Sequence, residues 1–267
     1  MSNIETVNAL FSAIERDRAD EVEALLSTEV LFRSFRGPTL RSQAAVGDWH
    51  REFLRDYADC VYSGVEFVEQ EDRAAVRATV SAKGFDWREF TQRMVEVFEF
   101  EDGVIKARRQ YAMMHNVEFG KPETAALKNV DEYPGGKPEV ALDLANGFFT
   151  SILAGDAEAA AGRLDPKAAL VDGVFGTAIG PENVVAILSE MPVPAFGGWR
   201  IASTIAGPKA ALVELEFAPG RPRAAHWVRV VEDRVVLVES YWMLREIGVR
   251  SDAGNNPRHA KQVILPI

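Results

Sequence analysis

Two hydrophobic periodicities alternate along the chain, and they occur in the same order in both halves. Apolar residues recur at helical spacing from Ile4 to Ile14 and again from Val140 to Ile152. Ser2 and Glu5 form an S-x-x-E capping box that predicts the start of the first helix. After about residue 60, and again after about residue 199, the period changes to two, which predicts a series of strands.

The two halves also align as an internal repeat. The segment around Ala9 fits the segment around Asn146 without a gap at a shift of 138 residues, so that Phe11 falls on Phe149. The strand regions from Asp72 and Phe100 align in the same way with later segments, after short differences in loop length. The sequence therefore predicts two similar domains.

Each copy begins with helices and ends with an antiparallel meander, an order that indicates the α+β class. We expect about three helices packed on a curved, mainly antiparallel sheet in each domain. The predicted domains are residues 1–115 and 139–246. Residues 116–138, rich in Pro, Gly and charge, are predicted to be a linker, and residues 247–267 a C-terminal extension.

Composition narrows the function classes. The chain has 40 acidic and 30 basic residues, a formal charge of −10 and a pI near 5.0, which argues against nucleic acid or an anionic membrane as the partner. The single cysteine, Cys60, cannot form an internal disulfide or a thiolate metal site. With no apolar run of membrane-spanning length, we expect a cytoplasmic protein without a metal or other cofactor.

One carboxylate stands inside an apolar run. Asp172 lies in the segment AALVDGVFG, directly before Gly173. Apolar surroundings raise the pKa of a carboxyl group, and such a group can act as a general base near neutral pH. The alternative is an Asx-type turn residue. Because Ser34 occupies the matching position of the first copy, the fold itself does not require an aspartate, and the first domain is predicted to be degenerate.

The order of elements resembles the nuclear transport factor 2-like superfamily, whose cone-shaped α+β domain includes ketosteroid isomerase and the SnoaL-like polyketide cyclases. The resemblance covers about residues 4–115 and 139–246 and implies two tandem cone-shaped domains. It implies that Asp172 is the proton-shuttling base, with Phe148 where that family carries a tyrosine. It also places Trp242 toward the cavity mouth and Trp227 near the family's protonated acid donor.

Proton abstraction next to a carbonyl also needs a hydrogen-bond donor for the developing enolate oxygen. His226 and Trp227 are adjacent on a predicted strand, so only one of them can line the cavity. The alignment favours Trp227, with His226 as the alternative. The predicted catalytic set is therefore Asp172, Trp227 and His226, and the predicted substrate-binding residues are Phe148, Phe175, Ser240 and Trp242.

These observations favour a cofactor-independent enzyme that transfers a proton on a hydrophobic carbonyl compound, as an isomerase, cyclase or dehydratase. The alternatives are an epoxide hydrolase or cyclase of the same superfamily, a small-molecule binding protein without turnover, and an interaction module, which would need an exposed apolar patch.

The first copy has an alternative role as a second site. It offers Arg33, Arg36, Arg41, His50 and Glu96, the last aligned with Trp227. Its favoured role is instead to cover the sheet of the second copy, since single domains of the family commonly dimerise through that sheet. The two domains are therefore predicted to pack as a pseudo-dimer.

Overall fold

The chain divides into two compact units, with the boundary between Ala112 and Met113. Unit one comprises Met1–Ala112 and Met243–Ile267, and unit two is Met113–Trp242. The computed structural model describes residues 1–35, 39–84, 89–113, 133–173, 176–190, 198–218 and 220–243. The predicted linker (116–138) and C-terminal extension (247–267) lie largely or wholly outside these ranges, so the finer domain division and the pseudo-dimer stay predictions.

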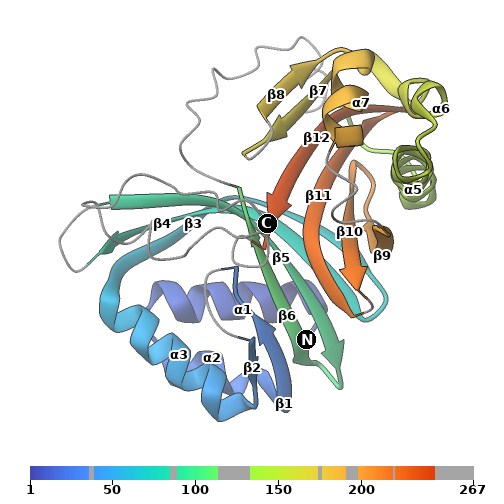
Figure 1. The fold of residues 1–267 in the computed structure, drawn as a ribbon. Coiled ribbons are helices and arrows are strands. Elements are labelled where there is room, and N and C mark those ends of the chain that lie inside the picture. Colours follow the sequence, from blue (N-terminus) through green and yellow to red (C-terminus); the bar gives the residue numbers. More distant parts are fainter. Residues whose placement is uncertain are drawn as a thin grey trace. The chain divides into compact units, whose positions relative to one another are not determined.

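Unit one places three helices before and between the first strands of one sheet (Figure 1). Its described elements are α1 (Asn3–Glu15), α2 (Ala19–Ala24), β1 (Leu26–Arg33), β2 (Thr39–Arg41), α3 (Gln43–Asp56), β3 (Tyr57–Gln70), β4 (Arg73–Gly84), β5 (Glu89–Glu101) and β6 (Val104–Ala112). Strands β3 to β6 form an antiparallel meander, and β1 pairs parallel with β6 and antiparallel with β2.

The predicted start of α1 is confirmed. The Ser2 hydroxyl accepts a hydrogen bond from the backbone of Glu5, whose carboxylate accepts one from the backbone of Ser2. The helix then buries Leu10 and Phe11 in the core of unit one, together with Phe98 of the sheet. Because α1 and α3 both contact the sheet, the apolar periodicity of the helices is explained by burial against the strands.

Unit two repeats this order. Its described elements are α5 (Pro138–Ala154), α6 (Ala157–Ala161), β7 (Leu164–Asp172), β8 (Gly176–Ile179), α7 (Pro181–Glu190), β9 (Arg200–Ala206), β10 (Ala210–Ala218), β11 (Arg221–Val231) and β12 (Arg234–Trp242). Strands β9 to β12 are antiparallel, and β7 pairs parallel with β12 and antiparallel with β8. Helix α5 packs against β9 to β12, and α7 packs against β7 and β8.

The predicted α+β class, with helices packed on a mainly antiparallel sheet in tandem units, is confirmed. In both units the strand after the second helix pairs parallel with the last strand of the meander. This shared topology brings the end of the first strand beside the end of the last strand. The place where Asp172 ends β7 is therefore next to the end of β12.

Strand register corrects one part of the repeat alignment. Strand β5 ends at the hairpin turn with Glu101, and β11 ends at the matching turn with Val231. Counted back from these turns, Glu96 corresponds to His226 and not to Trp227. The predicted match of Glu96 with Trp227 is therefore wrong by one residue. In a strand, that difference moves a side chain to the other face of the sheet.

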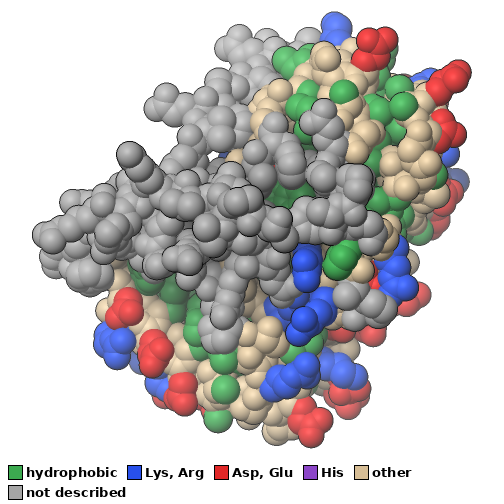
Figure 2. All heavy atoms as spheres, in the orientation of Figure 1, with side chains coloured by type: hydrophobic (Ala, Val, Ile, Leu, Met, Phe, Trp, Pro, Cys, Tyr) green, Lys and Arg blue, Asp and Glu red, His purple; other side chains and the backbone are tan. Residues whose placement is uncertain are grey.

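Charged side chains of both signs are mixed over the described surface, as Figure 2 shows for one face. Arg51 on α3, for example, forms ion pairs with Asp20, Glu23 and Asp48. Such exposed pairs contribute little to stability, because water and salt screen them. No helix in the described part of the chain is long and apolar enough to cross a membrane.

Candidate functional site

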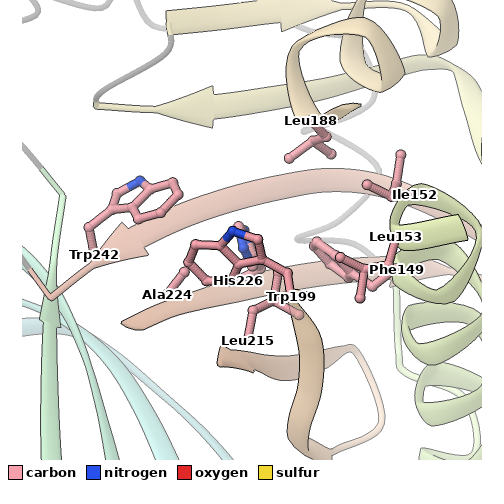
Figure 3. Close-up of a pocket in the computed structure, with 9 residues that line it drawn as sticks. All are labelled: Phe149, Ile152, Leu153, Leu188, Trp199, Leu215, Ala224, His226 and Trp242. Carbon is pink, nitrogen blue, oxygen red and sulfur yellow. The ribbon is translucent and has the colours of Figure 1, made fainter. Parts of the chain in front are cut away.

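Unit two contains a pocket between its helices and its sheet (Figure 3). Helix α5 supplies Phe149 and two aliphatic side chains, and α7 supplies Leu188. The strands supply the remaining wall together with Trp199, which directly precedes β9. The lining residues are Phe149, Ile152, Leu153, Leu188, Trp199, Leu215, Ala224, His226 and Trp242. The free volume for the centre of a water molecule is about 10 Å³, so a larger ligand must displace side chains of the wall.

His226 is the titratable member of this lining. Its side chain is fully buried on β11, and its Nδ1 lies 3.0 Å from the Ser240 hydroxyl oxygen. The ring centroid of Phe149 lies 4.6 Å from that of His226. Among the described residues, no side chain or backbone group is hydrogen-bonded to Nε2. Burial lowers the pKa of the imidazole to about 3, so His226 is neutral at physiological pH.

Asp172 is fully buried at the end of β7. Its Oδ2 accepts a hydrogen bond of 3.1 Å from the indole N–H of Trp242. Strand pairing places Asp172 opposite Ser240 on β12, and Ser240 opposite His226 on β11. Directly paired residues point to the same face of a sheet. Asp172, Ser240 and His226 therefore form one polar row across three neighbouring strands.

The placement of Trp227 differs from the sequence-based preference. Trp227 is paired with Leu212 and Glu239, whereas His226 is paired with Val213 and Ser240. The two side chains therefore point to opposite faces of β11, as expected from their adjacency. The expectation that Trp227 lines the cavity is wrong, because His226 is the member of the pair that lines this pocket.

The predicted substrate-binding residues have mixed placements. Trp242 lines the pocket. Ser240 is not a lining residue, but its hydroxyl contacts the imidazole of His226, which is one. Phe148 is fully buried but is not among the lining residues, and its neighbour Phe149 takes that position. Helical phase accounts for this difference, because adjacent residues of a helix point in directions about 100° apart. Phe175 lies outside the described residues.

Sequence reasoning missed several pocket residues. Leu188, Trp199 and Leu215 come from three separate elements, and no local motif links them. Two buried carboxylates of β10 have partners on β9. Glu214 accepts a hydrogen bond of 2.7 Å from the Ser203 hydroxyl, and Arg200 forms an ion pair with Glu216. Glu214 precedes Leu215, the pocket residue of β10, and so points to the other face of the strand.

One protein-family model matches part of this chain. Residues 7–108 match the SnoaL-like domain family. This match spans most of unit one. No curated protein matches the chain.

Three solved structures are similar to part of the chain, each with a TM-score of 0.39. A provisionally named polyketide cyclase from Pseudomonas putida KT2440 is 20% identical, over 42% of this chain and 91% of that chain. An NTF2-like protein of unknown function from Burkholderia pseudomallei K96243 is 24% identical, over 42% and 92%. A protein with a ketosteroid isomerase-like fold from Catenulispora acidiphila DSM 44928, solved with trimethylamine, is 12% identical, over 41% and 86%.

The low pKa of His226 makes stability depend on pH. In the unfolded chain an imidazole titrates near 6.5, whereas in the folded chain the pKa of His226 is about 3. Between these values the unfolded state binds more protons, so the free energy of unfolding falls as the pH falls below 6.5. From pH 7 to pH 5, His226 alone accounts for a loss of about 2 kcal/mol.

Urea unfolding followed by tryptophan fluorescence at pH 7 and pH 5 measures this loss. We expect the loss to be smaller by about that amount in His226→Gln, which has no imidazole to titrate. An equal loss in both proteins would show that His226 is not held neutral in the folded state.

Proposed function

We propose that unit two is a cofactor-independent enzyme that transfers a proton on a hydrophobic carbonyl compound, as an isomerase, cyclase or dehydratase. One observation carries this proposal. A fully buried, neutral His226 contributes to an otherwise apolar pocket, and its Nε2 has no hydrogen-bond partner among the described residues. A neutral imidazole in such a place is suited to exchange a proton with a bound molecule.

The hydrogen bond at Nδ1 determines whether Nε2 accepts or donates a proton. When Nδ1–H donates to the Ser240 oxygen, Nε2 carries a lone pair and accepts a proton from the carbon next to the carbonyl. The C–H electron pair then becomes part of the enolate, and the imidazolium returns the proton to an acceptor atom of the product. In the other tautomer, Nε2–H donates a hydrogen bond to the carbonyl oxygen.

Asp172 is assigned a supporting role in this proposal. It is not among the described residues that line the pocket, but Trp242, which is one of them, donates its indole N–H to the Asp172 carboxylate. Asp172 is separated from His226 by one strand, which carries Ser240. A carboxylate at that place favours the positive charge that the imidazole gains on taking a proton. Asp172 is therefore a positioning residue, and His226 is the group that meets the substrate.

The titratable side chains of the pocket also help to choose between proton transfer, epoxide hydrolysis and binding without turnover. Opening an epoxide requires a second acid to activate water or the epoxide oxygen, and the described lining supplies one titratable side chain, His226. This observation favours proton transfer over epoxide hydrolysis. Binding without turnover needs no catalytic group, so it is separated from the enzyme proposal by a direct assay of proton exchange.

Deuterium exchange into 1-tetralone tests the proposal without knowledge of the natural substrate. We expect the wild-type chain in D₂O to accelerate loss of the proton signal next to the carbonyl, as followed by ¹H NMR. His226→Gln should slow this exchange at least about 100-fold, a typical contribution of general acid–base catalysis. Trp227→Phe is the matched control, because Trp227 is adjacent in sequence but points to the other face, and it should leave the rate unchanged.

Either of two results would contradict the assignment. Exchange no faster than in buffer, with 1-tetralone bound, would mean a binding protein. An undiminished rate in His226→Gln would remove His226 from the reaction.

Asp172→Asn tests the supporting role of the carboxylate. We expect the variant to lower kcat for exchange about tenfold or more and to leave the KM for 1-tetralone unchanged, since Asp172 does not line the pocket. The melting temperature should stay equal or rise, because removing a buried charge removes its desolvation cost. An unchanged kcat, or a loss of activity that only follows a loss of folded protein, would contradict this role.

A further inference from the structure

The pocket of unit two is almost filled by its own side chains. Its free volume of about 10 Å³ for the centre of a water molecule is enough for roughly one water, and not for a bicyclic ketone such as 1-tetralone. At least one lining side chain must therefore move when a ligand enters. Which side chain moves depends on how firmly each of them is held.

Trp199 is one of two lining residues that reach the surface. Of the nine described residues that line the pocket, seven are buried, whereas Trp199 and Leu153 are only partly buried. Leu153 belongs to the last turn of α5, so the backbone hydrogen bonds of the helix hold its Cα in place. Trp199 lies just before β9, whose first paired residue is Arg200. Trp199 is therefore the part of the wall with the most freedom to move.

The backbone before Trp199 contains a glycine in an unusual conformation. Gly198 has a φ of +102°, which residues with a side chain rarely adopt. Gly198 is exposed, and a Cβ atom placed on it would have no neighbour within 4 Å. The backbone conformation, and not a lack of space, therefore favours glycine here. A glycine with free space around it is suited to act as a hinge for the adjacent side chain.

Aromatic contacts hold the Trp199 ring in the wall of the pocket (Figure 3). Its centroid lies 6.4 Å from that of Trp242, with the two ring planes at 88°, and 6.4 Å from that of Phe217. The ring centroid of Trp242 lies in turn 6.2 Å from that of His226. A ligand that offers its own apolar surface to Trp242 replaces such a ring contact. Outward movement of Trp199 would therefore open space close to the imidazole.

We propose that Trp199 is the movable wall of this pocket: it turns outward about Gly198 to admit the ligand, and its bulk limits the size of the ligand. The proposal rests on the ligand pocket of the proposed function, but not on proton transfer in it. Trp199 is thus a residue that determines size specificity, whereas His226 is the group assigned to the chemistry.

Movement of Trp199 can be followed by ¹⁹F NMR of the full chain labelled with 5-fluorotryptophan. The resonance of Trp199 is the one that Trp199→Phe removes. On addition of 1-tetralone we expect this resonance to shift and its D₂O–H₂O isotope shift to increase, because the ring becomes more accessible to solvent. Trp49, on α3 of unit one, is the internal reference and should keep its shift.

Ligand size tests the second part of the proposal. 1-Tetralone is compared with 1-oxo-tetrahydrophenanthrene, a ketone with one more fused ring, in ¹H–¹⁵N NMR titrations. We expect Trp199→Ala to raise the affinity for the larger ketone, relative to 1-tetralone, at least about tenfold, and Trp199→Phe to raise it less. Leu153→Ala is the matched variant, because it shortens the other partly buried lining residue. It should change this ratio less than about threefold.

Two results would overturn the proposal. One is a Trp199 resonance whose position and isotope shift stay the same in excess 1-tetralone. The other is a ratio of affinities that folded Trp199→Ala leaves unchanged, or that Leu153→Ala changes equally. If Trp199→Ala does not fold, the ¹⁹F measurement on the wild-type chain decides the question. Both experiments measure binding, so a chain that binds the ketones without exchanging their protons would contradict the proposed function and still support the role of Trp199.

Discussion

Burial of polar side chains on the helix-covered face of the sheet is the constraint on which the candidate site of unit two depends. A polar atom that loses water must find a partner inside the protein or carry an energetic cost of about 1–3 kcal/mol. In unit two, Ser240 and Trp242 supply partners to His226 and Asp172. One nitrogen of His226 and one oxygen of Glu96 still have no partner among the described residues. We assign the Nε2 atom of His226 to a ligand of the pocket.

The two units share the same strand pairing but carry different buried polar side chains at the matching position. Matched strand pairing places Glu96 and His226 at the same position, yet their partners differ. In unit one, a guanidinium balances the carboxylate and leaves an atom that can only accept a hydrogen bond. In unit two, a neutral imidazole can either accept or donate. The family match to residues 7–108 falls on unit one, the unit predicted to be degenerate. That degeneracy stays a prediction.

Periodicity and the repeat predicted the α+β class and the order of elements. The hydrogen bond between Trp242 and Asp172 was not part of that prediction. Periodicity and the repeat also could not predict which member of the His226–Trp227 pair lines the pocket. A period of two shows that neighbours point to opposite faces, but the face that meets the helices is set by strand register and packing. The one-residue error in the position of Glu96 has this same origin. The exchange of Phe148 for Phe149 instead reflects the rotational phase of α5. Pocket residues from separate elements, such as Leu188, come together only through the fold.

The central claim is that a neutral His226 presents a free ring nitrogen to ligands of the pocket. Long-range ¹H–¹⁵N correlation spectra of the ring, at pH 7 with and without 1-tetralone, test it most directly. The account predicts the shifts of a neutral imidazole, with a change at Nε2 on ligand addition and little change at Nδ1, which is engaged with Ser240. A charged imidazolium, or an Nε2 resonance that does not respond to saturating ligand, would contradict it.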